Sequence, residues 1–318
     1  MNNENFSLEV KNLCYTYGQG TPFCHEALHD VSFGVKKGSI CAVIGHTGSG
    51  KSTLVQMLNG LMIPDSGQVF VNGVCVVEPK KASKKRSKAE KKNKKDKKAA
   101  EMEQELIKKL CFRVGLVFQY PEYQLFEDTV EKDIAFGPTN MGLDEGEIRK
   151  RVVDAVKFVG LDSDLLQKSP FDLSGGQKRR VAIAGIIAMR PEILVLDEPA
   201  AGLDPTGRNE IFDGLVRYRN ETGATVIIVS HSMEDMAKIA DQMIVMAGGR
   251  CVMQGGCLEI FSRARELRKI GLDTPQITGL FEHLAKLGLP VNTGVFTVEA
   301  AKAEILKLLA QKGGDRRE

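Results

Sequence analysis

A glycine-rich stretch between two apolar segments constrains this chain more than any other feature. Residues 45–53 read Gly-His-Thr-Gly-Ser-Gly-Lys-Ser-Thr, after the run Ile40–Ile44 and before Leu54–Leu58. Glycines in such a loop let the backbone wrap with its N–H groups pointing inward, at the amino terminus of the following helix. The pattern therefore predicts a strand, a phosphate-binding loop and a helix, in that order.

Each part of this loop has an expected role in holding the phosphates of a nucleotide. Lys51 would reach the β and γ phosphates, and the Ser52 hydroxyl would ligate magnesium. The alternative is a glycine turn with a solvated lysine, which requires the match and its flanking segments to arise by chance. The expected nucleotide-binding positions are Gly45, His46, Thr47, Gly48, Ser49, Gly50, Lys51, Ser52 and Thr53.

The net charge of the chain hides a strong local asymmetry. Of the 318 residues, 80–98 include twelve Lys or Arg against two acidic residues, a charge of +10, so the remaining residues carry −7 of the total of +3. Such a segment cannot bury apolar surface, and we expect residues 79–98 to be disordered. Two interpretations stay open: a tolerated surface loop, or a segment that touches anionic lipid headgroups or RNA.

Cysteine usage and hydropathy indicate a cytosolic protein. The seven cysteines form no C-x-x-C pair and no zinc-type cluster, which is typical of reduced thiols. No signal peptide is evident. The most apolar windows, 181–189 and 193–196, are far shorter than the roughly 18 residues that span a bilayer. If the protein serves a membrane process, we expect a partner to cross the membrane.

Hydrophobic periodicity predicts an α/β fold. Apolar runs that alternate with helical patterns favour a parallel sheet, with the strand before the glycine loop at its centre. A helical insert is expected at about 121–189. The first strands are expected to be antiparallel and edge-like, and Asn72-Gly73 is expected to form a hairpin turn. The predicted strands are 6–17, 31–35, 40–44, 112–118, 193–197 and 225–229, with the hairpin over 68–76. The predicted helices include 99–110, 145–159, 175–189 and 207–219.

The pattern after residue 262 predicts a second, smaller unit. Pro275 at a first helical position opens an amphipathic helix that ends at Gly288, and Thr297 caps another helix that ends at Gly313. We therefore expect a large domain over residues 6–262, which carries the lysine-rich insertion at about 79–105, and a helical module over 263–318.

Two further motifs carry chemistry. Asp197 and Glu198 follow four apolar residues, at the edge of the sheet where α/β folds bind ligands. Asp197 would hold magnesium, directly or through water, and Glu198 would orient or deprotonate an attacking water; a solvated acidic turn is the alternative. Leu173–Gln177 precedes a helix and offers a second anion site, or else a flexible turn and cap. One nucleotide needs only one such site on its own chain. We therefore expect the second site to bind the γ-phosphate of a nucleotide held by another subunit, through Ser174, Gly175, Gly176 and Gln177.

Taken together and in this order, the motifs resemble those of the ABC-transporter ATPases. The resemblance covers residues 6 to about 250 and implies an α/β P-loop NTPase cassette, with a mixed sheet core, an antiparallel β edge and a helical subdomain, that binds ATP and Mg²⁺. It implies that Gln119 contacts magnesium, that His231 acts at the γ-phosphate or attacking water, and that Tyr17 stacks on adenine, with Tyr15 as its rival. The matching segments are Walker A at 45–53, the Q-loop Gln119, the signature 173–177, Walker B 193–197 with Glu198, the D-loop 202–205 and the switch His231.

A narrower resemblance points to the energy-coupling factor (ECF) transporter ATPases. The resemblance rests on residues 118–126 and 133–138 and on the Thr274–Ile277 start of the helical module. This chain is more similar to the second of the family's two ATPase paralogues than to the first. The lysine-rich insertion departs from the short link usual in that family. The resemblance implies a transmembrane T component, a substrate-binding S component and a second ATPase, which is a paralogue or a copy of this chain.

The function implied is ATP hydrolysis that drives uptake of vitamins or other micronutrients, by a peripheral subunit at the cytoplasmic face of the cell membrane. The helical insert near residues 119–126 would push on the T component. Cobalt or nickel uptake by the same family is an alternative. A soluble ABC ATPase acting on nucleic acid is the competing class, but such proteins usually carry two cassettes or a long coiled coil, so no nucleic-acid partner is expected.

Overall fold

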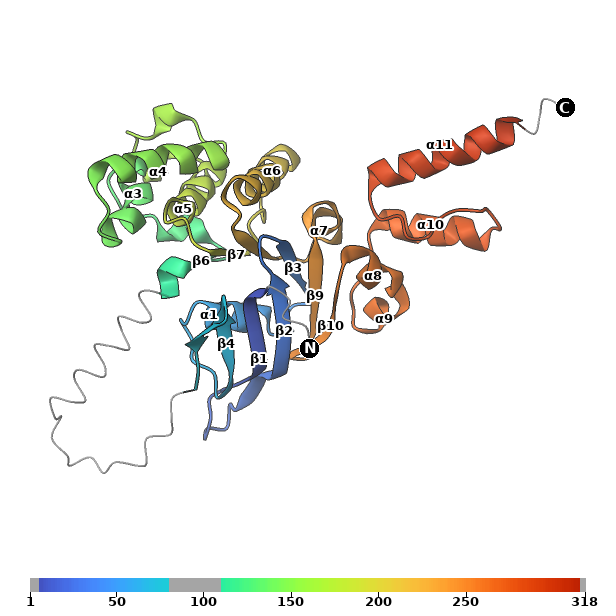
Figure 1. Ribbon diagram of the computed structural model, residues 1–318, viewed down its shortest axis with the longest axis horizontal. Coiled ribbons are helices and arrows are strands. Elements are labelled where there is room, and N and C mark those ends of the chain that lie inside the picture. Colours follow the sequence, from blue (N-terminus) through green and yellow to red (C-terminus); the bar gives the residue numbers. More distant parts are fainter. Residues whose placement is uncertain (1–5, 80–109, 315–318) are drawn as a thin grey trace.

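The computed structural model describes residues 6–79 and 110–314. The lysine-rich segment and almost all of the helix predicted at 99–110 lie outside these residues. Figure 1 shows a β-rich centre, with one group of helices beside it and a separate group formed by the carboxyl-terminal residues.

A six-stranded sheet with the order β10-β9-β3-β8-β7-β6 forms this centre. All neighbouring pairs are parallel except β9 and β10. The predicted central position of the strand before the glycine loop is confirmed, because β3 lies between β8 and β9. The bounds are β3 Ile40–Ile44, β6 Val114–Val117, β7 Ile193–Asp197, β8 Thr225–Val229, β9 Gln242–Ala247 and β10 Arg250–Gly255.

Side chains on both faces of this sheet are buried, which explains the uninterrupted apolar runs. In β3, Ile40, Ala42 and Ile44 face one core cluster, whereas Cys41 and Val43 face the other. The first cluster lies under helices α4 (Glu145–Phe158), α5 (Gly175–Ala188) and α6 (Pro205–Thr222), and the second lies against the antiparallel strands. Every residue of β3, β7 and β8 is buried.

The antiparallel strands form a sheet of their own, with the order β2-β1-β4-β5. They are β1 Phe6–Tyr17, β2 His25–Lys36, β4 Ser66–Val71 and β5 Val74–Val77. The predicted hairpin turn is confirmed, since Asn72 and Gly73 have φ values of 47° and 77°, as a type I′ turn requires. The predicted strand 31–35 is too short, because β2 begins six residues earlier and pairs with the end of β1.

Helices between β6 and β7 form the insert predicted at 121–189, beside the edge of the six-stranded sheet (Figure 1). The short 3₁₀ helices η1 Pro121–Gln124, η2 Ser163–Leu165 and η3 Pro170–Asp172 connect its parts. The α-helices of the insert are α3 Val130–Asn140, α4 Glu145–Phe158 and α5 Gly175–Ala188, and those of the central region are α1 Lys51–Leu58, α6 Pro205–Thr222 and α7 Met233–Ile239.

Two boundaries differ from the sequence prediction. The strand predicted at 112–118 begins only at Val114, because residues 110–113 are helical and Leu110 is buried in the core. The helix predicted at 207–219 begins at Pro205, because the Asp204 side chain accepts a hydrogen bond from the N–H of Gly207 and caps it.

The carboxyl-terminal residues form helices, as predicted, and these lie together at the right in Figure 1. They are α8 Cys257–Ser262, α9 Ala264–Lys269, α10 Gln276–Lys286 and α11 Val298–Gly314. Phe281, Val295 and Ala301 make a small cluster of their own. Pro275 is the N-cap of α10 rather than its first helical residue. Within the described ranges, none of the helices combines the length and apolarity that a bilayer crossing requires.

Candidate active site

The glycine loop joins β3 to α1, as the sequence predicts, and its backbone conformation requires glycine at specific positions. Gly48 and Gly50 have φ values of 79° and 96°. A Cβ atom at Gly45 would overlap the carbonyl oxygen of Met246 in the neighbouring strand β9. The loop therefore packs closely against β9 at the carboxyl ends of the strands, and α1 begins where the loop ends.

Lys51 folds back over the loop. Its Nζ donates to the carbonyl oxygens of Gly45 at 2.7 Å and His46 at 2.9 Å. Burial lowers the pKa of this ammonium group, while the nearby Glu198 and Asp197 act in the opposite direction. Lys51 thus lies between the loop and two carboxylates, in position to meet the negative charge of a phosphate chain.

Ser52 and Asp197 bring two oxygen ligands together from different elements. The Ser52 hydroxyl, at the start of α1, donates to Asp197 Oδ2 at the end of β7 over 3.3 Å. Burial raises the pKa of the Asp197 carboxyl. Hydroxyl and carboxylate oxygens suit Mg²⁺, which commonly takes its remaining ligands from phosphates and water. Among the described residues, no group of three or more His, Cys, Asp or Glu could hold a metal ion by itself.

Glu198 and His231 form a hydrogen-bonded pair at the adjacent strand ends. His231 Nδ1 lies 2.8 Å from Glu198 Oε1. Glu198 has a φ of 51°, a conformation uncommon for a residue with a side chain, and its N–H donates to the carbonyl oxygen of Val229 at 2.9 Å. The hydrogen bond to Val229 therefore holds the Glu198 backbone against β8, and His231 contacts one oxygen of the carboxylate.

Gln119 follows β6 and lines the same region. A cavity of about 290 Å³ has Gln119, Lys51, Ser52, Asp197 and Glu198 on its walls. An adjoining cavity of about 700 Å³ is also lined by Gln119, Lys51 and Glu198, and by His46 and His231. The predicted Walker A, Q-loop, Walker B and switch residues of one chain are thus brought together.

Sequence reasoning missed Arg179, which holds the Gln119 segment in place. This guanidinium is buried in α5, forms an ion pair with Glu122 at 3.2 Å, and donates to the carbonyl oxygens of Gln119, at 3.0 Å, and Ala201. It therefore joins the segment after β6 to the segment after Glu198. In the sequence, Arg179 stands in the polar run Gln177–Arg180 at the start of the predicted helix, where nothing distinguishes it from a solvated cation.

The structure distinguishes the two aromatic candidates. Tyr17 lines the 290 Å³ cavity, is 40% exposed, and its hydroxyl lies 3.2 Å from Thr53 Oγ1. The Tyr15 and Tyr17 rings pack in a T-shaped arrangement with centroids 4.8 Å apart, and Tyr15 packs against the core. Tyr17 therefore has the open face that stacking on a base requires. Cavity-lining residues that the sequence analysis did not name are His25, Ala27, Met233, Glu234, Gly271, Leu272, Asp273 and Gln276.

The signature residues do not join this group. Ser174 caps α5 by accepting from the Gln177 N–H at 3.3 Å, while Gln177 Oε1 accepts from the Ser174 N–H at 2.9 Å. Both residues line a different cavity of about 510 Å³, together with Gly176 and the D-loop residues Leu203 and Asp204. Within one chain, the structure does not bring Ser174 to the glycine loop.

The fold and these motifs define the ATP-binding cassette of an ABC transporter. Residues 28–201 match the ABC transporter family model. The chain is 48% identical over 302 residues to the energy-coupling factor transporter ATP-binding protein EcfA2 of Caldanaerobacter subterraneus subsp. tengcongensis, covering 95% of this chain and 97% of that protein. It is 49% identical over 303 residues to EcfA2 of Clostridium acetobutylicum, covering 95% and 98%. The chain belongs to the energy-coupling factor transporter ATP-binding proteins, and it is an ATPase.

Solved structures agree with this assignment. CbiO1 of Clostridium perfringens, described as part of the ABC transporter complex cbiONQ, aligns with a TM-score of 0.67 at 38% identity, over 88% of this chain and 100% of that one. The cassette MJ0796, in a dimeric post-hydrolysis state bound to ADP and phosphate, aligns with a TM-score of 0.63 at 25% identity, over 79% and 98%.

Proposed function

We propose that this chain is a peripheral subunit, at the cytoplasmic face of the cell membrane, that hydrolyses ATP to drive vitamin or micronutrient uptake. Its partners are a second ATPase of the same family, a transmembrane T component and a substrate-binding S component. The observation that carries the proposal is the convergence of Lys51, the Ser52–Asp197 pair and the Glu198–His231 pair at the carboxyl ends of neighbouring strands.

The arrangement supports hydrolysis by an activated water. Lys51 and the loop N–H groups bind the phosphate chain, and the Tyr17 ring stacks on the adenine. Ser52 and Asp197 would hold magnesium, and the ion would supply positive charge beside the phosphates. Glu198 accepts a proton from the attacking water or orients it, and His231 positions the Glu198 carboxylate. Gln119 lines both cavities of the site, so it can report the presence of a nucleotide to the helical insert that follows it.

The signature segment is proposed to act on a nucleotide bound by the partner ATPase. Ser174, Gly175 and Gly176 stand at the start of a 14-residue helix, where N–H groups and the helix dipole favour an anion. Their separation from the glycine loop of the same chain supports a head-to-tail pair with two shared sites. Either a paralogue or a second copy of this chain would satisfy that geometry.

Exposed aromatic side chains on the insert offer a contact for the T component. Tyr120, Tyr123, Phe126 and Phe136 are between 45% and 84% exposed, and Phe126 meets the Phe136 ring edge-on at 4.8 Å. Such a group of exposed aromatics is typical of a protein interface. The group begins directly after Gln119, so changes at the γ-phosphate would reach the interface through a few residues.

Cobalt uptake is a second candidate transport activity. The structural relative CbiO1 is described as part of the cbiONQ complex, and the ATPase site itself does not select the transported substrate. Vitamin and cobalt transport therefore predict the same chemistry in this chain and different membrane partners.

Purification of the tagged chain from membranes of its own host tests the assignment. We expect integral T and S components and a second ATPase to copurify, and the complex to show ATP-dependent substrate uptake in vesicles. The same preparation carrying Glu198→Gln is the control, because it should assemble without transporting. A chain that copurifies with no integral membrane protein would contradict the proposal.

A further inference from the structure

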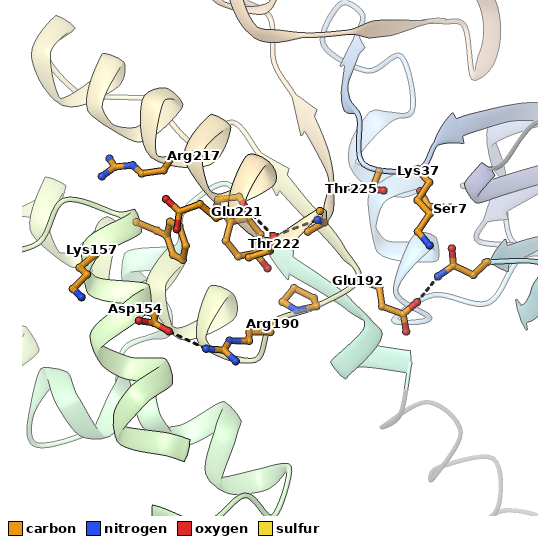
Figure 2. Close-up of a pocket in the computed structure, with 16 residues that line it drawn as sticks. Ser7, Lys37, Asp154, Lys157, Arg190, Glu192, Arg217, Glu221, Thr222 and Thr225 are labelled. Atoms are coloured by element: carbon orange, nitrogen blue, oxygen red, sulfur yellow. Dashed lines mark hydrogen bonds and ion pairs between the residues drawn. The ribbon is translucent and has the colours of Figure 1, made fainter. Parts of the chain in front are cut away.

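A large cavity lies at the end of the six-stranded sheet opposite to the active site. It encloses about 890 Å³ and reaches Glu192 and Thr225, which stand at the amino-terminal ends of β7 and β8 (Figure 2). The residues that hold ATP lie at the carboxyl ends of the same strands. The volume is within the range of small-molecule sites, which is roughly 300–1,000 Å³.

Three separate parts of the fold form the walls of this cavity. Asp154 and Lys157 come from α4 of the helical insert, Arg217 comes from α6, and Lys37 comes from the turn after β2. Figure 2 shows Lys157 and Arg217 at one end of the cavity and Lys37 at the other. A molecule bound here would therefore touch the insert, the central region and the antiparallel sheet together.

The charges in the cavity do not cancel. Arg190 is neutralised by Asp154 at 2.8 Å, and Glu192 is neutralised by Arg113, whose Nε lies 2.7 Å away. None of the three remaining cations, Lys37, Lys157 and Arg217, lies within ion-pair distance of a carboxylate of the described residues. Lys37 is nevertheless near enough to Glu192 to help lower the pKa of that carboxyl. One carboxylate, Glu221, also lines the cavity without an ion pair to any described residue. The charge that these pairs leave over is therefore positive, with Lys157 and Arg217 at one end of the cavity and Lys37 at the other.

The floor of the cavity is buried and partly aromatic. Tyr218 is 1% exposed and packs edge-on against Phe158 with ring centroids 5.2 Å apart. The Tyr218 hydroxyl is buried and has no hydrogen-bond partner among the described residues. Buried hydroxyl groups without a partner are uncommon in folded proteins, and they are found where a ligand or water completes the site.

We propose that this cavity binds a small polyanion, a molecule with two or more phosphate or carboxylate groups. One anionic group would lie between Lys157 and Arg217, and a second would approach Lys37. Charge-assisted hydrogen bonds of this kind are among the stronger polar contacts in proteins. Because Lys157 belongs to the insert and Arg217 to the central region, the occupant ties these two parts together on the side away from ATP.

Calorimetric titration of the full-length chain with inorganic pyrophosphate, and separately with citrate, tests the proposal. ADP is present at saturating concentration, so that the glycine loop is already filled. We expect at least one of the two probes to bind, and the variant Lys157→Ala/Arg217→Ala to bind it about tenfold more weakly or worse. Binding of citrate alone or of pyrophosphate alone identifies the carboxylate or the phosphate class, and either result supports the site.

The matched control is Lys238→Ala/Arg250→Ala, which removes the same charges from exposed positions outside the cavity. This control should bind the probe as the unaltered chain does. Arg217→Lys keeps the charge and should retain most of the affinity. All variants should bind ADP normally, which shows that they are folded. Failure of both probes to bind, or equal affinity in the Lys157→Ala/Arg217→Ala variant, overturns the proposal.

Discussion

Glu198 combines an uncommon backbone conformation with a directed side chain. Its φ of 51° is maintained by the hydrogen bond from its N–H to Val229, and its carboxylate is held by His231 at 2.8 Å. Strain of this kind persists where the surrounding structure fixes it, commonly at functional sites. Under the proposed mechanism, this conformation aims the Glu198 carboxylate at the attacking water.

Replacing Glu198 with Gln should therefore abolish turnover without preventing ATP binding. The amide keeps the size of the carboxylate but cannot accept a proton, so phosphate release should fall by at least about 100-fold. Equilibrium binding of ATP should be unchanged. Glu299→Gln, at an exposed position on α11, is the control and should leave the rate unaltered. Normal hydrolysis by Glu198→Gln would exclude this residue as the base.

Replacing Asp197 with Asn should raise the stability of the nucleotide-free protein and abolish its activity. Burial raises its pKa, so in the nucleotide-free protein its ionised form costs stability at pH values above that pKa. Asp197→Asn should raise the melting temperature at pH 7 by about 2 °C, because the amide oxygen can still accept from Ser52. The difference should vanish at low pH, where Asp197 is protonated. Mg²⁺-dependent hydrolysis should be lost at every pH. A lower melting temperature at pH 7 would contradict the expected sign.

The residues of the site were predictable where one short segment carries the chemistry. The glycine loop, the acidic pair and the signature each have a fixed spacing and a fixed place after or before a regular element. The resemblance favoured Tyr17 for stacking but kept Tyr15 as its rival, because residues two apart in a strand share a face. Only the position of Thr53, which comes from another element, separates them.

At the level of elements, Arg179 connects three segments that are distant in the sequence. Arg179→Met should destabilise the protein by about 2 kcal/mol, because it leaves Glu122 and two carbonyl oxygens without their donor. Urea unfolding measures the change. In the double variant with Glu122→Gln, the two losses should be less than additive. Additive losses would show that the ion pair contributes nothing by itself.

Elements buried on both faces were the most predictable. β3, β7 and β8 are short apolar runs with clear ends, and each was found within its predicted bounds. β9 and β10 were not predicted, although they complete the sheet, because no motif drew attention to them. The first residues of β2 are exposed and polar, and only pairing with β1 makes them a strand. Pairing between distant segments is the information that a local pattern lacks.

At the scale of the whole molecule, the sheet separates two kinds of site. The catalytic groups gather at the carboxyl ends of its strands, whereas the proposed polyanion cavity lies at the amino ends. The signature cavity shares no lining residue with either of them. Under the proposed head-to-tail pairing, a single chain presents one catalytic half and one signature half, and each half is completed by the partner ATPase.

This division predicts different consequences for the two halves when an ATPase pair is assembled. Lys51→Ala should remove ATP from its own chain, because the loop loses the cation that meets the phosphates. Ser174→Arg should leave ATP bound to its own chain while hydrolysis at the partner's nucleotide is lost, since arginine fills the space in front of α5. Photolabelling with an azido-ATP analogue measures ATP binding, and phosphate release measures hydrolysis.

If the chain pairs with itself, mixing the two variants in equal amounts should restore about a quarter of the unaltered rate. Half of the pairs then contain one chain of each variant, and each such pair has one intact composite site out of two. Loss of labelling in the Ser174→Arg chain itself would place the signature at its own nucleotide and contradict the shared site.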